Sequence, residues 1–162
     1  MSRQVDSRTV TLTELPQGPA DEGGRPTVTV VIPVYFAEAT LGRLMDAVLD
    51  AFRPKFGLQV VLVNDGSTDG THDECERLVE DHPDVVTYVR LARNFGEHNA
   101  VMAGLHRAEG EYVVIMDDDF QNSPSDAVRL VEETRDGGFD VVYSRYPELE
   151  LAELLGLALG AR

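Results

Sequence analysis

The chain has 162 residues, of which 43% are hydrophobic and 27% are charged, and these values are ordinary for one globular domain. Fourteen Lys and Arg stand against 29 Asp and Glu, and the net charge of -15 argues against nucleic acid as a partner. The only cysteine, Cys75, excludes an internal disulfide and favours a reducing compartment, so we expect a cytoplasmic protein. No apolar run reaches the ~18 residues of a membrane-spanning helix, and no transmembrane segment is expected.

Three segments differ in composition. Residues 1–26 are rich in Ser, Thr, Gly, Pro and charge and show no sustained period, so we expect a flexible leader. Residues 27–146 alternate apolar runs with amphipathic stretches, and they are predicted to form the folded domain. Residues 147–162 form an acidic, leucine-rich tail, for which a short helix is one interpretation.

The predicted elements of the domain alternate in chain order. They are a strand at 27–35, a helix at 38–52, a strand at 58–65, a helix at 67–82, a strand at 85–91, a helix at 96–110, a strand at 111–116, a helix at 123–138 and a strand at 139–145. Gly110 and one of Gly137 and Gly138 are the predicted helix ends. Strands separated by helices imply right-handed crossovers, so the predicted fold class is α/β, an open, Rossmann-like, mainly parallel sheet with helices on both faces.

Polar clusters follow three of the predicted strands. They are "PVYFAE" at 33–38, "NDGSTDG" at 64–70 and the acidic stretch "DDDFQN" at 117–122. Parallel sheets bind ligands at the carboxyl ends of their strands, because the loops there gather helix N-termini and free backbone groups. One edge of the sheet is therefore predicted to hold the functional site.

The first two clusters each have a functional and an ordinary interpretation. The ring of Tyr35 can stack on a base and Glu38 can accept from a base N–H, but Pro33 and Tyr35 can equally belong to a plain strand-to-helix turn. In the second cluster, Asp65 ends a strand and Gly66 permits a tight turn, which is also the chemistry of helix capping.

The acidic cluster is the strongest signal for a metal site. In an extended segment the side chains of Asp117 and Asp119 lie on one side, and that of Asp118 on the other. Two converging carboxylates suit Mg²⁺ or Mn²⁺ bound to a diphosphate, and Gln121 has the same parity and can add an amide oxygen. The alternative is an acidic, solvated turn that caps a helix.

A fourth stretch lies directly before the helix predicted at 96–110. Arg93, Asn94 and Gly96 precede its first turn, where free N–H groups can meet an anion or a base edge. His98 follows in that turn, and without a visible partner we interpret it as a helix-surface residue and not as a catalyst.

Together, four stretches resemble the nucleotide-binding half of the family 2 glycosyltransferases, which have the GT-A fold. They are "VVIPVY", "VLVNDGSTDGT", "RNFGEHNAVMAGLHRAEGEYVVIMDDDFQNSP" and "GFDVVYSR". They are most similar to the polyprenyl-phosphate glycosyltransferase branch. The resemblance implies that Pro33 and Tyr35 line a nucleobase pocket and that Asp65 recognises the base edge. It also implies that Asn94 and Gly96 lie near the donor.

The resemblance extends to the acidic motif, with some departures. Asp117 and Asp119 match the acids of the family's D-x-D motif, which binds the nucleotide sugar and its divalent metal, and Gln121 matches the glutamine that follows. The middle residue is usually small in the family, but here it is Asp118, which we also expect to face the substrate. After the tyrosine the family usually has Asn and then Glu, whereas this chain has Phe36 and Ala37 and places Glu38 one position late.

The predicted function is therefore the binding of a nucleotide-diphosphate sugar with Mg²⁺ or Mn²⁺ for inverting transfer to a polyprenyl phosphate at the inner face of the membrane. The catalytic base is expected in a C-terminal half that the 162 residues lack, so the fold is expected to be C-terminally truncated, and a second chain or a homo-oligomer could complete the site. One alternative is a non-catalytic nucleotide-binding or interaction module. Another is a haloacid-dehalogenase-type phosphatase, although the only lysine, Lys55, precedes the acids instead of following them.

Overall fold

The computed structural model describes residues 23–119 and 123–142. The strands are β1 (Thr27–Val34), β2 (Gly57–Asn64), β3 (Val86–Arg90) and β4 (Tyr112–Ile115). The helices are α1 (Leu41–Phe52), α2 (Thr71–Asp81), α3 (Glu97–Leu105) and α4 (Pro124–Gly137). No helix within the described ranges is both long enough and apolar enough to span a membrane.

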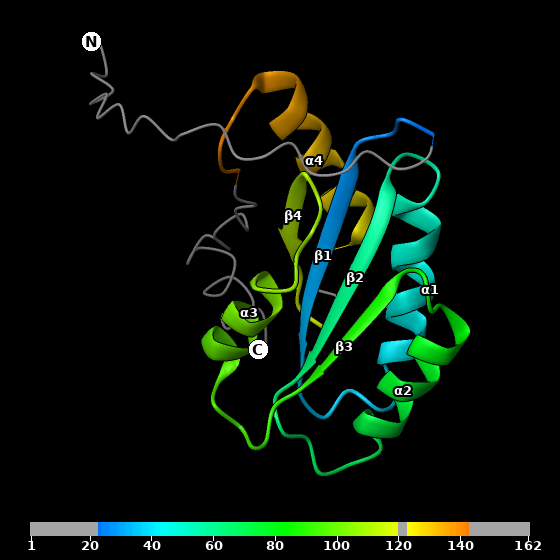
Figure 1. The fold of residues 1–162 in the computed structure, drawn as a ribbon, viewed down its shortest axis with the longest axis vertical. Coiled ribbons are helices and arrows are strands. Elements are labelled where there is room, and N and C mark those ends of the chain that lie inside the picture. The colour runs from blue at the N-terminus through cyan, green and yellow to red at the C-terminus, as the bar shows by residue number, and fades with distance from the viewer. Residues whose placement is uncertain (1–22, 120–122, 143–162) are drawn as a thin grey trace, which may run out of the picture. The chain divides into compact units, whose positions relative to one another are not determined.

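The four strands form one parallel sheet in the order β3-β2-β1-β4 (Figure 1). In its register Val31 pairs with Val61 on one side and with Ile115 on the other. The strand order reverses between β1 and β4, and the ends of strands at such a switch point are where open α/β sheets bind ligands. The predicted fold class, an open parallel α/β sheet with helices on both faces, is confirmed.

Alternate residues of a strand face opposite sides of the sheet and therefore pack against different helices. Val31, Val61 and Val63 form one buried cluster with Ala100 of α3. A Cβ atom at Gly104 would lie 2.3 Å from Val31 Cγ1, so α3 approaches the sheet closely at this glycine. Figure 1 shows α1 and α2 on the other side of the sheet. Helix α1 buries one apolar face, made of Leu41, Leu44, Met45, Val48, Leu49 and Phe52.

Helices α1, α2 and α3 are shorter than predicted, and α2 begins at Thr71 and not at 67. Helix α1 begins at Leu41 and not at 38, because Ala37 O accepts from the N–H groups of Thr40 and Leu41 and thereby forms a turn. Helix α3 ends at Leu105 and not at Gly110. The chain after it runs against β1, where Thr29 Oγ1 accepts from Gly110 N at 2.9 Å, so tertiary contacts override the helical pattern.

The described residues fall into two compact units, of which the first ends at Val128 and the second begins at Arg129, within α4. In the second unit, Gly138 has φ +63° and Phe139 N donates to Thr134 O at 3.1 Å, the hydrogen bond of a Schellman ending. The predicted glycine stop is confirmed. The strand predicted at 139–145 is not found over residues 139–142, and the remainder of it lies outside the described residues.

Strand β4 is more exposed than its apolar sequence suggested. Val113 and Ile115, which share one face, are 43% and 52% exposed. Helix α3 packs mainly against β1 and β2, which leaves these two side chains of β4 partly exposed. The acidic motif therefore follows a half-exposed edge strand among the described residues, and not a fully buried one.

Cys75 provides a test of the packing beneath α2. Burial raises the pKa of its thiol to about 12, and the neighbouring acids Glu74, Asp69 and Glu76 add to the shift. Because the thiolate is the reactive form, we expect iodoacetamide at pH 8 to alkylate Cys75 at least ~100-fold more slowly in the folded protein than in urea. Mass spectrometry of timed samples measures both rates. Equal rates would contradict the burial of this thiol.

Candidate functional site

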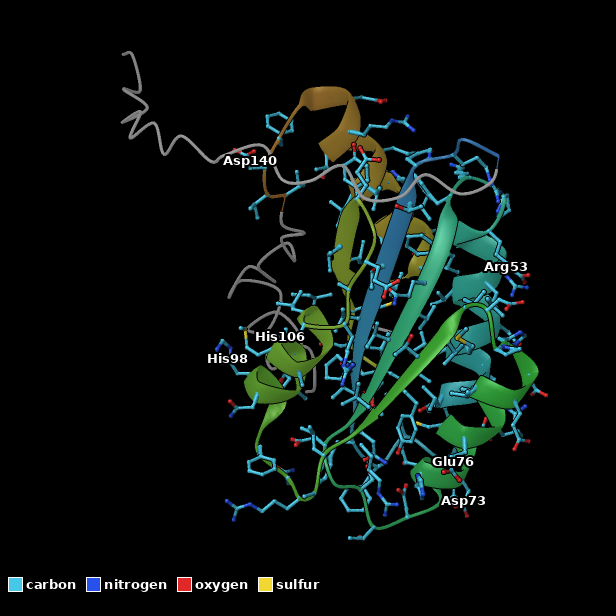
Figure 2. All side chains as sticks on the ribbon, viewed as in Figure 1. Arg53, Asp73, Glu76, His98, His106 and Asp140 are labelled. Carbon is cyan, nitrogen blue, oxygen red and sulfur yellow. The ribbon has the colours of Figure 1, made fainter. Side chains whose placement is uncertain are left out.

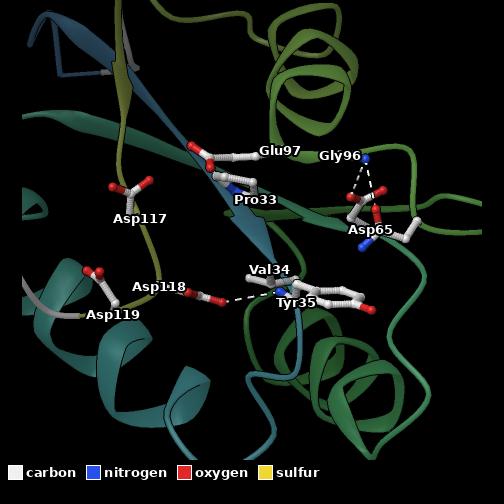
Figure 3. A pocket seen from close by; sticks show the side chains of 10 residues that line it. Pro33, Val34, Tyr35, Asp65, Gly96, Glu97, Asp117, Asp118 and Asp119 are labelled. Carbon is white, nitrogen blue, oxygen red and sulfur yellow. Dashed lines mark hydrogen bonds between the residues drawn. The ribbon is translucent and has the colours of Figure 1, made fainter.

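A cavity of about 330 Å³ lies at the carboxyl ends of β1, β2 and β4, beside the first turn of α3 (Figure 3). Its size falls at the lower end of the range for ligand pockets. It is lined by Pro33, Val34, Tyr35, Asp65, Asn94, Gly96, Glu97, Asp117, Asp118 and Asp119. The structure thus brings eight of the ten predicted site residues to one place, and it adds Val34 and Glu97, which the sequence reasoning missed.

Asp65 fixes the loop before α3. It is only 4% exposed, and its two carboxylate oxygens accept from Phe95 N at 2.7 Å and Gly96 N at 2.9 Å. The preceding residues of the loop pass so close to Gly66 that a Cβ atom there would lie 2.4 Å from Arg93 C. The loop after β2 and the loop before α3 are therefore held tightly together. Two backbone N–H groups fix the carboxylate of Asp65 at the edge of the cavity.

The three consecutive aspartates alternate as strand geometry predicts. Figure 3 shows Asp118 directed toward the loop after β1, where its Oδ2 accepts from Tyr35 N at 3.2 Å. Asp117 and Asp119 point away from that loop, and both are exposed at the cavity. Asp118 therefore ties the end of β4 to the end of β1, and its two neighbours line the cavity.

Asp118 makes the stability of the metal-free protein depend on pH. Partial burial raises its pKa, and the charges of Asp119 and Asp117 raise it further, against the lowering effect of the Tyr35 hydrogen bond. The folded state therefore binds this proton more tightly than the unfolded state, and ionisation above the raised pKa costs stability. We expect Asp118→Asn to be more stable than the parent at pH 7, because the amide oxygen still accepts from Tyr35 N.

The advantage of Asp118→Asn should shrink as the pH falls and Asp118 in the parent becomes protonated. Urea unfolding from pH 4 to pH 8 in a chelating buffer measures it. The matched control is Asp50→Asn, which removes an exposed carboxylate from α1. A pH-independent difference between Asp118→Asn and the parent would contradict this account.

Glu38, a predicted substrate-binding residue, does not line the cavity. Its Oε2 accepts from Gly70 N at 3.0 Å, so it joins the loop after β1 to the start of α2. Two parallel bonds reinforce this connection, from Phe36 N to Ser67 Oγ at 3.1 Å and from Ala37 N to Thr71 Oγ1 at 2.9 Å. Glu38 stands one position later than the glutamate of the family pattern, and in the structure it connects two loops instead of lining the cavity.

Phe36 is held in a strained conformation between these bonds. Its φ of +57° is in the left-handed region, which asparagine tolerates better than phenylalanine, and its side chain is 52% exposed. We expect Phe36→Asn to raise the free energy of unfolding by about 1 kcal/mol. Phe36→Ala is the control, since alanine keeps the unfavourable φ. If urea unfolding found the asparagine variant no more stable than the alanine variant, the strain argument would be wrong.

Other candidate groups lie outside the cavity. Among the described residues, His72, Asp73 and Glu76 of α2 place three ligand atoms within 4.8 Å of one another, but they are not part of the cavity lining. Figure 2 shows Asp73 and Glu76 on α2, and it shows His98 on α3, directed away from the sheet. The interpretation of His98 as an exposed helix-surface residue is confirmed.

The cavity has the donor set of a divalent-cation site. None of its ten described lining residues carries a positive charge, whereas five carry carboxylates. Asp65 and Asp118 already accept from backbone N–H groups, and Asp117 and Asp119 present hard oxygen atoms of the kind that Mg²⁺ and Mn²⁺ prefer. Gln121, the third predicted metal ligand, lies outside the described residues.

The fold and the cavity define an α/β protein with an acidic ligand site at the switch point of a parallel sheet. Residues 29–150 match the model of the family described as "Glycosyl transferase family 2", and the chain belongs to this family. This membership decides against the phosphatase alternative.

Two similar curated proteins are undecaprenyl-phosphate 4-deoxy-4-formamido-L-arabinose transferases. The one from Proteus mirabilis is 37% identical over 119 residues, which are 73% of this chain and 36% of the relative. The one from Pectobacterium atrosepticum is 41% identical over 117 residues, which are 71% of this chain and 35% of the relative. The chain thus spans about a third of the length of these relatives.

Solved structures agree with the fold. A mannosyltransferase from Pyrobaculum calidifontis, in complex with GDP-Man and Mn²⁺, is similar with a TM-score of 0.54 and 38% sequence identity. The match covers 59% of this chain and 28% of the mannosyltransferase. The fold is therefore of the GT-A type.

Proposed function

We propose that this chain binds a nucleotide-diphosphate sugar together with Mg²⁺ or Mn²⁺, for inverting transfer of the sugar to a polyprenyl phosphate. The observation that carries the proposal is the pair Asp117 and Asp119, which face a cavity at the switch point in a member of this family. The Pyrobaculum structure, which holds GDP-Man and Mn²⁺, supports the choice of donor and metal. The names of the curated relatives support the choice of acceptor.

We assign the nucleoside to the part of the cavity formed by Pro33, Tyr35 and Asp65. The exposed ring of Tyr35 offers a face on which a base can stack, and Asp65 offers carboxylate edges for a base N–H. Asn94 and Gly96 form the adjoining wall, which Asp65 holds rigidly. Residues 27–146 form the donor-binding domain in this proposal, between a leader and a leucine-rich tail.

Asp117, Asp119 and Gln121 are the residues that would hold the divalent cation. When bound, the cation supplies positive charge that neutralises the diphosphate leaving group. The chain's own contribution is orientation, because Asp118 anchors the acidic segment to Tyr35 N and so fixes the two outer carboxylates relative to the base-binding wall. An acceptor phosphate, with a second pKa near ~6, is largely ionised at neutral pH and needs little help from a protein base.

Calorimetric titration with nucleoside diphosphates in the presence of Mn²⁺ tests donor binding. The expected result is heat of binding for one or more of them, and its loss when a chelator replaces the metal. If no nucleoside diphosphate gave heat under any metal condition, the proposed donor site would be wrong.

Transfer requires a separate test, because the chain spans only about a third of its curated relatives. Radiolabelled sugar is offered to the 162-residue chain together with a polyprenyl phosphate. Transfer of the labelled sugar to the polyprenyl phosphate supports the proposal that the chain is a glycosyltransferase. Donor binding without turnover supports the second candidate, a nucleotide-binding module that lacks transferase activity on its own.

A further inference from the structure

Among the described residues that line the cavity, Glu97 is the one acidic residue that belongs neither to the acidic motif nor to the base-binding wall. It is the first residue of α3 and is exposed, and its side chain lines the cavity. Figure 3 shows its carboxylate extending over Pro33 toward Asp117, which comes from the opposite side of the cavity. The two carboxylates thus approach the same space from α3 and from the end of β4.

The two groups are uncompensated within the described structure. No hydrogen bond or ion pair joins the carboxylate of Glu97 or of Asp117 to another described residue, and the described lining of the cavity contains no positive side chain. An acidic residue at a helix N-terminus is favourable by itself, but that effect does not require the carboxylate to face a second one. Two like charges that face each other destabilise the folded protein unless a cation lies between or beside them.

We propose that Glu97 contributes a third negative charge to the divalent-cation site and so strengthens cation binding beyond what Asp117 and Asp119 provide. The inference rests on the proposed function, since it takes the cavity to be the metal-dependent donor site. Glu97 acts here as a positioning residue for the cation. This charge would also help a cavity whose described lining has no Lys or Arg to accept a pyrophosphate, because it raises the occupancy of the cation that binds the pyrophosphate.

Electron paramagnetic resonance of free Mn²⁺, titrated with the full 162-residue chain at low salt, tests the inference with the metal alone. We expect Glu97→Gln to weaken Mn²⁺ binding about tenfold, as Coulomb attraction over a few ångströms in a partly hydrated site predicts. Glu97→Asp keeps the charge and should restore most of the affinity. Glu109→Gln, the same chemical change at an exposed position outside the cavity, should have no effect.

The outcomes separate this inference from the proposed function. If calorimetry shows Mn²⁺-dependent nucleotide binding by the parent but Glu97→Gln leaves Mn²⁺ affinity unchanged, Glu97 serves only the N-terminus of α3 and the inference falls alone. A parent that binds neither Mn²⁺ nor any nucleoside diphosphate overturns both. Equal losses in Glu97→Gln and Glu109→Gln would assign the effect to net charge and would also overturn the inference.

Discussion

Replacing both outer carboxylates, Asp117→Asn with Asp119→Asn, is expected to weaken Mn²⁺-dependent binding of nucleoside diphosphates by about 100-fold or more, equivalent to about 2.8 kcal/mol. The reason is that the proposed function makes these two residues the charged oxygen ligands of the cation, and asparagine replaces each carboxylate with a neutral amide. Calorimetry with and without Mn²⁺ measures the change. Binding in the absence of metal should be weak in the parent and in the variant alike.

The control for this variant is Asp46→Asn with Asp50→Asn. These two residues are exposed on α1, away from the cavity lining, and the substitutions remove the same number of negative charges. The control should keep the affinity of the parent. An equal loss in both double variants would mean that overall charge, and not the acidic motif, governs metal-dependent binding.

Gly66→Ala is expected to have the largest effect on folding, with a loss of about 2 to 4 kcal/mol in the free energy of unfolding. The residue has φ +73°, and a Cβ atom would lie 2.4 Å from Arg93 C and 2.5 Å from Asn94 N. Backbone atoms cannot move aside as a flexible side chain can, so the two loops must separate. Their separation would also break the bonds from Phe95 N and Gly96 N to Asp65 and loosen the cavity.

Gly24→Ala separates the collision from the backbone strain. Gly24 has φ +72°, but an added Cβ would meet nothing within 4 Å. This variant should therefore lose only the ~1 to 2 kcal/mol of a left-handed conformation. Urea unfolding compares the two. Similar losses at both positions would show that the close approach at Gly66 does not matter.

Periodicity in the sequence was sufficient for much of the fold and for the acidic motif. The alternation of apolar runs predicted the parallel sheet, and the period of two along a strand predicted that Asp118 would point away from Asp117 and Asp119. Both predictions depend on local backbone geometry, which the residues themselves determine. The early end of α3 was not predictable in this way, because the hydrogen bond from Gly110 N to Thr29 joins residues far apart in the chain.

In the candidate site, too, features that depend on local geometry were predictable, and features that depend on contacts between distant residues were not. Asp65 and Tyr35 could be placed at the carboxyl ends of strands from the sequence, but the bracing position of Glu38 depends on how the first loop meets the start of α2. Glu97 was missed because an acidic residue in the first turn of a helix is ordinarily explained by the helix dipole. The only signal in the sequence was its position next to Gly96, inside a stretch already singled out.

The most direct measurement is a crystal of the 162-residue chain soaked with a nucleotide-diphosphate sugar and Mn²⁺, in which anomalous scattering locates the metal. The account predicts a Mn²⁺ peak within coordination distance of carboxylate oxygens of Asp117 and Asp119, in contact with the diphosphate, and the base beside Tyr35. A nucleotide bound elsewhere, or bound in this cavity with both aspartates turned away from any metal peak, would contradict it.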